Sequence, residues 1–142
     1  VPQNHIRVVE RLAQNLFICS PHVSQVVALE AMSCEDELFQ NLNIYRENRQ
    51  KVMEGLQQIG LKSFAPPDGA FYFYIDISEF SDDSLSFCND ILEEVGVAVT
   101  PGVDFDPQRG KTTIRISYAR STEEITEGIT RLSEFMKKRG YI

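Results

Sequence analysis

The sequence predicts an α+β fold in two layers, with a short mixed sheet packed by helices and preceded by long helices. Three observations support this prediction. Apolar residues recur every three or four positions through the first part of the chain, which is typical of amphipathic helices. After Lys62 the apolar period falls to two, as in half-buried strands, and the two patterns then alternate. The chain has 142 residues and can therefore bury a core without disulfides or a metal.

Three helices are expected before the first strand, over residues 4–18, 21–32 and 33–60. Ser20 is predicted to cap the second helix and Pro21 to be its first residue, because these residue types favour those positions. Gly60 is expected to end the third helix, since glycine readily adopts the left-handed backbone found there. Leu61 would then supply the apolar contact of a Schellman cap.

The remaining elements are predicted as strands 62–64 and 70–77, helix 81–95, strand 97–100, loop 101–111, strand 113–118 and a helix opened by Ser121. Alternation in the second of these strands directs Phe73 and Ile75 toward the helices. It leaves Tyr72 and Tyr74 on the more polar face. Ser121 and Glu124 have the spacing of a capping box, which favours the start of the last helix.

Composition excludes several classes of function. Fourteen Lys and Arg against 21 Asp and Glu give a net charge of −7 with no basic stripe, so no nucleic-acid partner is expected. No apolar run reaches the roughly 18 residues that span a bilayer, so we expect a soluble protein without a membrane partner. Three cysteines without a CxxC pair fit a reducing cytosol, which predicts a cytoplasmic location. The two histidines have no companion at metal-ligand spacing, so no metal site is expected.

Arg115 is the first candidate for a binding role. It lies in the middle of a predicted strand between Ile114 and Ile116, where a guanidinium must point to water or meet an anion. The pattern leaves two interpretations open, a solvated or ion-paired structural arginine and a carboxylate-binding residue. Arginine suits the second role because its planar fork donates two parallel hydrogen bonds to a carboxylate. Arg120 is the competing candidate, but its position at a strand-to-helix turn favours a solvated role.

Three motifs resemble a known family in sequence and in spacing. They are GAFY at residues 69–72, GVAVTPGVDF at 96–105 and IRISYA at 114–119. Together they resemble the carboxy-terminal part of class I/II pyridoxal-phosphate aminotransferases, which have the aspartate aminotransferase fold. Pro21 and Ser24-Gln25 also match the segment that leads from the large domain to the small one. The resemblance implies that residues 1–32 are connecting helices from an absent large domain and that residues 33–142 are the small domain.

The resemblance also implies roles for individual residues. Arg115 matches the family's arginine that binds the α-carboxylate of the substrate. Pro101, Gly102 and Phe105 resemble a loop beside the substrate entrance, which is expected to belong to the active site. Asp106 replaces the glycine that usually follows that phenylalanine, so the closed geometry of the loop and the substrate preference are open. Ser20 lies near the place where some members reach the partner's active site across a homodimer interface, although a helix boundary explains Ser20 equally well.

The expected cofactor is pyridoxal 5'-phosphate, and the expected substrates are an amino acid and a 2-oxo acid. The family's Schiff-base lysine follows a serine in an S-K motif, and this sequence has no such motif. Lys51, Lys62 and Lys111 have no matching context. No catalytic residue is therefore assigned to this chain, which should be inactive alone. Because the chain opens at Val1 in amphipathic sequence, we expect it to be cut from a longer enzyme of amino acid metabolism.

A different class of function stays open beside the enzyme. The α+β core looks complete by itself, so the chain could be a stand-alone, non-catalytic module that binds a carboxylate or another protein. The two hypotheses differ in what the reading frame contains upstream. An S-K motif there favours the aminotransferase, whereas a start codon at this boundary favours the module.

Overall fold

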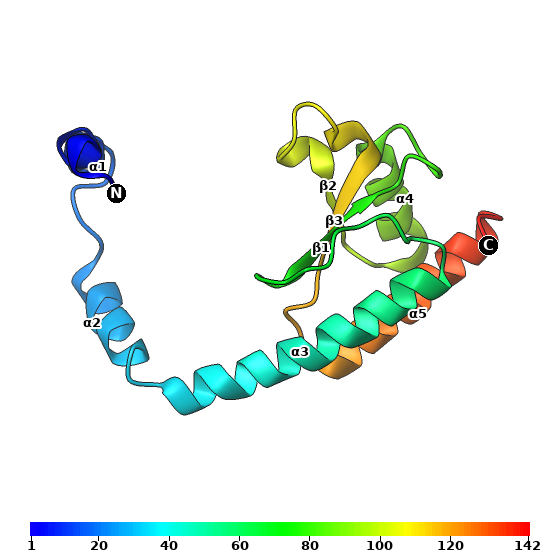
Figure 1. Ribbon diagram of the computed structural model, residues 1–142, viewed down its shortest axis with the longest axis horizontal. Coiled ribbons are helices and arrows are strands. Elements are labelled where there is room, and N and C mark those ends of the chain that lie inside the picture. Colours follow the sequence, from blue (N-terminus) through cyan, green and yellow to red (C-terminus); the bar gives the residue numbers. More distant parts are fainter. The chain divides into compact units, whose positions relative to one another are not determined.

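The computed structural model describes residues 1–142 and confirms the α+β fold class (Figure 1). In chain order the helices and strands are η1 (Gln3–His5), α1 (Ile6–Leu16), α2 (His22–Ala31), α3 (Glu35–Gln58), β1 (Tyr72–Asp76), α4 (Ser84–Val95), β2 (Thr100–Pro101), η2 (Gly102–Asp104), η3 (Gly110–Thr112), β3 (Thr113–Ser117) and α5 (Thr122–Lys138). Here α denotes an α-helix, η a short 3₁₀-helix and β a strand.

The chain divides into two compact units, Val1–Phe39 and Gln40–Ile142, with the boundary inside α3. The first unit contains α1 and α2, and neither helix has a buried residue. Apolar side chains of α1 such as Ile6, Val9 and Leu12 are all exposed. The amphipathic pattern of α1 is therefore present, but no part of its own unit covers the apolar side.

The prediction that Ser20 caps the second helix is wrong. Pro21 is the N-cap residue of α2, and its backbone is extended with ψ at 140°. The carbonyl oxygen of Pro21 accepts the amide hydrogen of Gln25 at 3.2 Å. Because Pro21 itself stays outside the helical conformation, α2 begins one residue later than expected and the Ser20 side chain makes no cap.

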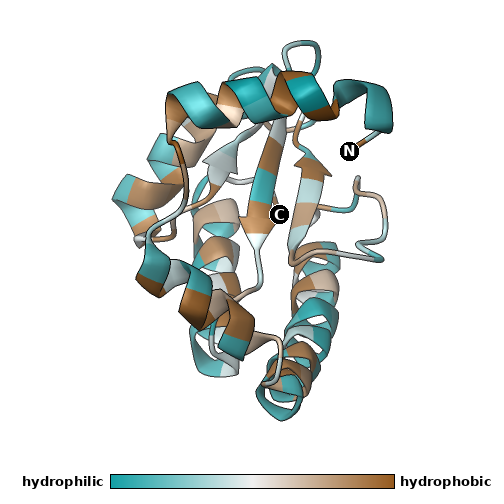
Figure 2. Cartoon of the chain, turned by 90° about the vertical axis from the view of Figure 1, so that its left-hand side faces the viewer, coloured by the Kyte–Doolittle hydropathy of each residue, from teal (hydrophilic) through white to brown (hydrophobic).

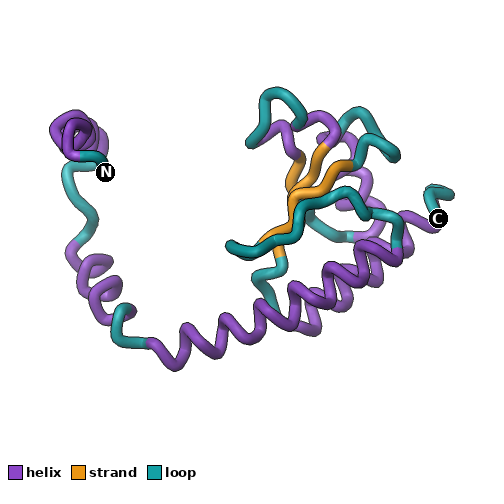
Figure 3. The backbone as a smooth tube through the Cα atoms, viewed as in Figure 1, coloured by secondary structure: helices purple, strands orange, loops and turns teal.

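The second unit is built around a three-stranded sheet in the order β1-β3-β2 (Figure 3). Both neighbouring pairs are antiparallel, with Phe73 opposite Ile116 and Thr100 opposite Arg115. The sheet was expected to be mixed, and this detail differs. β1 and β2 do run parallel to each other, but β3 lies between them, so no two hydrogen-bonded neighbours are parallel. The strand of Arg115, β3, is therefore the central strand of the sheet although it is the last strand in the sequence.

One face of the sheet packs on the helices and forms the core. Phe73, Ile75 and Ile114 are completely buried there. They meet side chains from three helices, namely Val52 and Leu56 of α3, Phe87 and Ile91 of α4, and Ile125, Leu132, Phe135 and Met136 of α5. Figure 2 shows the matching alternation of hydrophobic and hydrophilic residues along the strands. The other face of the sheet carries Tyr72, Tyr74 and Arg115, which line a cavity.

Helix ends in this unit follow local signals closely. Gly60 has a φ of +84°, and the amide of Leu61 donates to Leu56 O at 3.0 Å, which confirms the Schellman cap. The capping box of Ser121 and Glu124 is complete. The α4 helix begins at Ser84 rather than at Ser81, because the Asp83 carboxylate accepts the amide hydrogens of the first turn.

Two predicted strands are shorter in the structure. Residues 62–64 form only a single bridge, Phe64 to Ile75, because the amide of Phe64 turns back to the carbonyl of Lys62. Residues 97–100 contribute only Thr100 to β2, which continues to Pro101. A proline has no amide hydrogen, so this strand remains a short edge. None of the helices combines the length and the apolar character that crossing a membrane requires.

Candidate carboxylate-binding site

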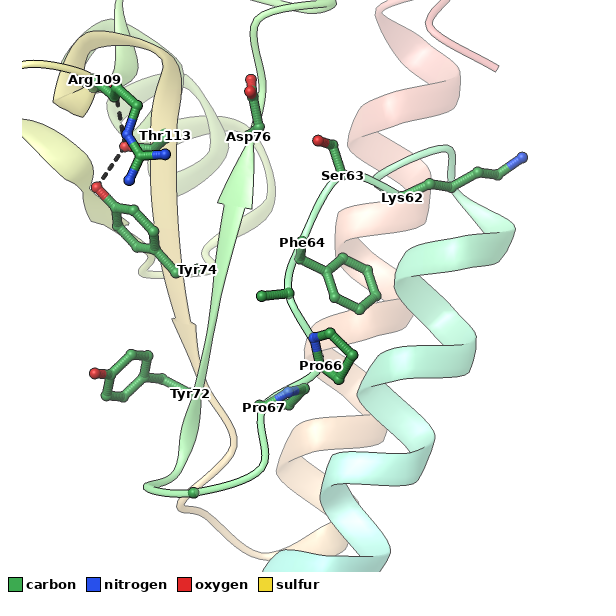
Figure 4. A pocket seen from close by; sticks show the side chains of 12 residues that line it. Lys62, Ser63, Phe64, Pro66, Pro67, Tyr72, Tyr74, Asp76, Arg109 and Thr113 are labelled. Atoms are coloured by element: carbon green, nitrogen blue, oxygen red, sulfur yellow. Dashed lines mark hydrogen bonds between the residues drawn. The ribbon is translucent and has the colours of Figure 1, made fainter.

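Arg115 lies on the central strand, on the face of the sheet opposite the core. In the antiparallel register it is opposite Tyr74 on β1 and Thr100 on β2. Its neighbours Ile114 and Ile116 point to the helices, so alternation directs the Arg115 side chain to the other face. Figure 4 shows Tyr72 and Tyr74 pointing to one common side of β1. The central strand therefore presents one guanidinium beside two phenols.

The Arg115 guanidinium is held between two aromatic rings. Its central carbon lies 4.7 Å from the ring centroid of Phe105 and 5.5 Å from that of Tyr72. One Nη donates a long hydrogen bond of 3.5 Å to the Thr100 hydroxyl. The Nε is buried without a partner, and no carboxylate lies within ion-pair distance. The two rings contact the guanidinium, and no acidic side chain occupies its donors.

The other arginines of this unit that are candidates for binding already have acidic partners. Arg49 pairs with Asp68 at 3.4 Å, and Arg139 pairs with Asp90 and Glu94. Arg120 is exposed and lies 3.9 Å from Glu124, which agrees with the solvated role expected for it. Arg49 is also half-buried, and its Nε likewise has no partner, so Arg115 differs from it in having no acidic partner at all. A half-buried arginine without an acidic partner is a candidate for binding an anion.

A cavity of about 420 Å³ opens over this guanidinium. It is lined by Tyr72, Tyr74, Phe105, Asp106, Pro107 and Arg115. A neighbouring cavity of about 570 Å³ shares Tyr72 and Tyr74 and extends toward Arg109 and Asp76 (Figure 4). The two phenols therefore form the common wall of both cavities.

The loop that carries Phe105 is fixed at its base. A Cβ on Gly102 would collide with the Thr113 hydroxyl and lie 2.8 Å from the Gly110 carbonyl oxygen. The buried Ser84 hydroxyl donates to that same carbonyl oxygen at 2.6 Å. Thr113 in turn shares a 2.7 Å hydrogen bond with the Tyr74 hydroxyl. The backbones of Gly102 and Gly110 approach each other closely, and this contact fixes both ends of the loop that carries Phe105.

The structure separates the roles of the three loop residues named from the sequence. Phe105 stacks on Arg115 and lines the cavity. Gly102 is buried at the base of the loop, and Pro101 pairs with Ile114 in the sheet. The pattern gave no sign of Thr100 or Pro107, because their place beside Arg115 depends on the pairing of β2 with β3 and on the path of the loop. Ser20 belongs to the other unit, where it is exposed between α1 and α2.

Asp106, which stands where a glycine was expected, organises the tip of the loop. Its Oδ1 accepts the amide hydrogens of Gln108 at 2.9 Å and Arg109 at 3.0 Å, and its Oδ2 accepts from Arg109 Nε at 3.2 Å. The amide of Arg109, then that of Gln108, holds the pKa of the Asp106 carboxyl below its ordinary value of 3.8. The carboxylate is therefore occupied by its own loop although it borders the Arg115 cavity.

We expect acid to loosen this loop. Because the pKa of Asp106 is lower in the folded protein than in the unfolded chain, its contribution to stability is complete above pH 3.8. The contribution is lost as the pH falls from there through the lowered pKa. Hydrogen exchange of the Gln108 and Arg109 amides should accelerate relative to core amides over that interval. In Asp106→Asn this extra acceleration should be absent, and an equal acid response in both proteins would contradict the assignment.

Pyridoxal phosphate does not fit these residues as its holders. Covalent attachment requires a lysine amine, and no lysine lines the cavity over Arg115. The cavity's one strong donor is the Arg115 fork, which matches a carboxylate. No group of three or more His, Cys, Asp or Glu could hold a metal ion either. Among the residues that line this cavity, the Arg115 guanidinium is the group with the charge and the shape to bind an anion.

A small α+β unit whose sheet carries an arginine without an acidic partner, next to two aromatic rings, has a candidate anion-binding site. The chain belongs to the aminotransferase class I and II family, whose sequence pattern matches residues 2–132.

Relatives with known names support this membership. The valine–pyruvate aminotransferase of Mycobacterium tuberculosis is 42% identical over 96% of this chain and 36% of its own length. The (5-formylfuran-3-yl)methyl phosphate transaminase of Methanocaldococcus jannaschii is 39% identical over 94% of this chain and 35% of its own. A crystal structure of an aminotransferase from Mycobacterium tuberculosis has a TM-score of 0.85 and 41% identity, covering 97% of this chain and 36% of that one. The chain thus spans about a third of the length of these relatives.

Proposed function

We propose that this chain is the carboxy-terminal part of a cytoplasmic, homodimeric pyridoxal-phosphate-dependent aminotransferase. The whole enzyme transfers an amino group between an amino acid and a 2-oxo acid, and Arg115 binds the α-carboxylate. In this proposal residues 1–32 are connecting helices and residues 33–142 are the small domain. The observation that carries the proposal is the half-buried Arg115 guanidinium, which contacts the rings of Phe105 and Tyr72, lines a cavity and has no acidic partner.

The residues of this chain bind and orient the substrate. An amino acid and a 2-oxo acid both carry a carboxylate next to the reacting carbon, so one arginine serves both half-reactions of this proposal. Two parallel hydrogen bonds from the Arg115 fork fix the position and the rotation of that carboxylate. Phe105 and Tyr72 exclude water from the guanidinium faces, which strengthens its attraction for the anion. Pyridoxal phosphate, when bound, supplies the electron sink for the amino-group transfer.

The names of three relatives support an α-carboxylate as a feature of the substrate. They act on valine with pyruvate, on aspartate or on LL-diaminopimelate, as their names state. Valine, aspartate and LL-diaminopimelate differ in their side chains and share the α-amino acid group, and pyruvate is a 2-oxo acid with its carboxylate in the same place. Pro101, Gly102 and Phe105 form the loop beside that group in our proposal. Ser20 is proposed to contact the partner subunit in the homodimer.

The proposal is tested on the full-length product of the gene that encodes this chain. Pyridoxal phosphate should bind to that product and shift its visible absorbance, and the product should move an amino group from at least one common L-amino acid to pyruvate or 2-oxoglutarate. The chain of residues 1–142 alone should show no transfer. A full-length product that neither binds the cofactor nor transfers an amino group would overturn the enzyme assignment and leave the binding module.

A further inference from the structure

Asn48 of α3 is a fully buried polar residue outside the cavity over Arg115. Its exposed fraction is 0%, and its side-chain Nδ2 donates to two carbonyl oxygens about seventy positions away in the sequence. These oxygens belong to Tyr118 at 3.0 Å and Arg120 at 2.8 Å. The Oδ1 of the same amide has no partner. Burying an unpaired acceptor costs stability, so the contribution of Asn48 lies in its two donated hydrogen bonds.

The two hydrogen bonds from Asn48 reach the segment just after β3, where the backbone has no neighbouring strand as a partner. The ladder between β1 and β3 ends with Tyr72 opposite Ser117, and one more backbone bond follows, from Tyr118 N to Phe71 O at 2.9 Å. Beyond this point no strand offers amide hydrogens to the carbonyls that follow. The Asn48 amide takes the place of the missing strand and ties the end of β3 to α3.

The end of β3 lies opposite Tyr72, one of the two residues whose rings contact Arg115. Ser117 is paired with Tyr72, whose ring lies 5.5 Å from the Arg115 guanidinium, and Arg115 itself is two residues before Ser117. We therefore expect a shift of Tyr118 to displace Arg115 on β3 and to change its position relative to the Tyr72 ring. On the neighbouring position of α3, Arg49 pairs with Asp68 in the turn that leads to β1. The α3 helix thus contacts the approaches to both strands.

We propose that Asn48 is a positioning residue for the carboxylate site and sets the place of Arg115 by fixing the end of β3 on α3. This inference rests on the proposed function of Arg115. It predicts that removal of the two donors weakens binding of a carboxylate although Asn48 does not touch the ligand. Asn48→Leu is the informative change, because leucine has a similar volume and no hydrogen-bond donor.

The experiment uses the full-length protein and pyruvate as the probe. Phenylglyoxal modifies arginines, and mass spectrometry of the Arg115 peptide gives the pyruvate concentration that half-protects this residue. We expect that concentration to rise about threefold to tenfold in Asn48→Leu. KM for the amino acid should rise by a similar factor, with a smaller change in kcat. Asn48→Ser, which keeps a hydroxyl donor, should give a smaller rise and serves also if the leucine variant does not fold.

Met136→Ala is the matched control. Met136 is as completely buried, but it lies in the last turns of α5, about 21 Å along the helix from Thr122 at the rise of a regular helix. It should lower the melting temperature without changing the protection of Arg115. Equal effects of both variants on protection, or none from Asn48→Leu, would overturn the positioning role. If pyruvate protects Arg115 in no variant, including the unaltered protein, the proposed function of Arg115 fails instead.

Discussion

Replacing Arg115 by alanine should weaken the binding of a carboxylate substrate at least about 100-fold. Two hydrogen bonds to a charged group are removed, each worth roughly 1.5–3 kcal/mol, and every 1.4 kcal/mol is a factor of about ten in affinity. Because the half-buried guanidinium has no acidic partner, its removal leaves no buried carboxylate without a counter-charge. The fold should therefore survive. Titration calorimetry of the full-length protein with pyruvate measures the change, and circular dichroism checks the fold.

Two further variants test the assignment. One separates the hydrogen-bonding geometry of the Arg115 guanidinium from its positive charge, and the other is a control at a different arginine. Arg115→Lys keeps the positive charge but replaces the planar fork by a point charge, so only part of the affinity should return. Arg120→Ala removes an exposed arginine whose partner is Glu124, and its effect should stay within about twofold. If Arg120→Ala weakens binding as much as Arg115→Ala, the carboxylate site has been assigned to the wrong residue.

Gly102→Ala should have the largest effect on stability. Its Cβ would lie 2.7 Å from the Thr113 backbone oxygen and 2.8 Å from that of Gly110, and it would overlap the Thr113 hydroxyl. Backbone atoms on both sides leave no flexible side chain to yield, so the loop must leave its base. We expect the free energy of unfolding to fall by about 3 kcal/mol, as for overpacked cores. Urea denaturation measures this loss.

Gly128→Ala is the matched control, because a Cβ there meets nothing within 4 Å and Gly128 lies inside α5. This variant should gain up to about 1 kcal/mol, since alanine favours a helix over glycine. In Gly102→Ala we also expect Phe105 to lose its contact with Arg115, which would weaken pyruvate binding. Unchanged stability in Gly102→Ala would show that the loop is not fixed by the crossing of its glycine backbones.

Local signals explain which parts of the fold the sequence predicted well. The Gly60 cap and the Ser121 capping box depend on residues within one helical turn, and both are present as predicted. The strand of Arg115 was predicted from alternation alone and differs by one residue at its end. The error at Ser20 arises because Pro21 keeps an extended backbone and is itself the N-cap residue. The predicted strand 62–64 is reduced to one bridge because the amide of Phe64 bonds the carbonyl of Lys62.

The candidate site also has features that the sequence predicted and features that only the tertiary structure shows. The sequence by itself determined that Arg115 lies on the polar face of a strand, because side chains alternate along any strand. It also indicated that Phe105 lies in a loop beside a ligand, through the resemblance of its motif. Only the tertiary structure decided that Arg115 lacks an acidic partner and that Phe105, Tyr72 and Thr100 surround it. Those contacts depend on placing β3 between β1 and β2, which joins residues far apart in the chain. A local pattern fixes the direction of a side chain, whereas its partners depend on long-range packing.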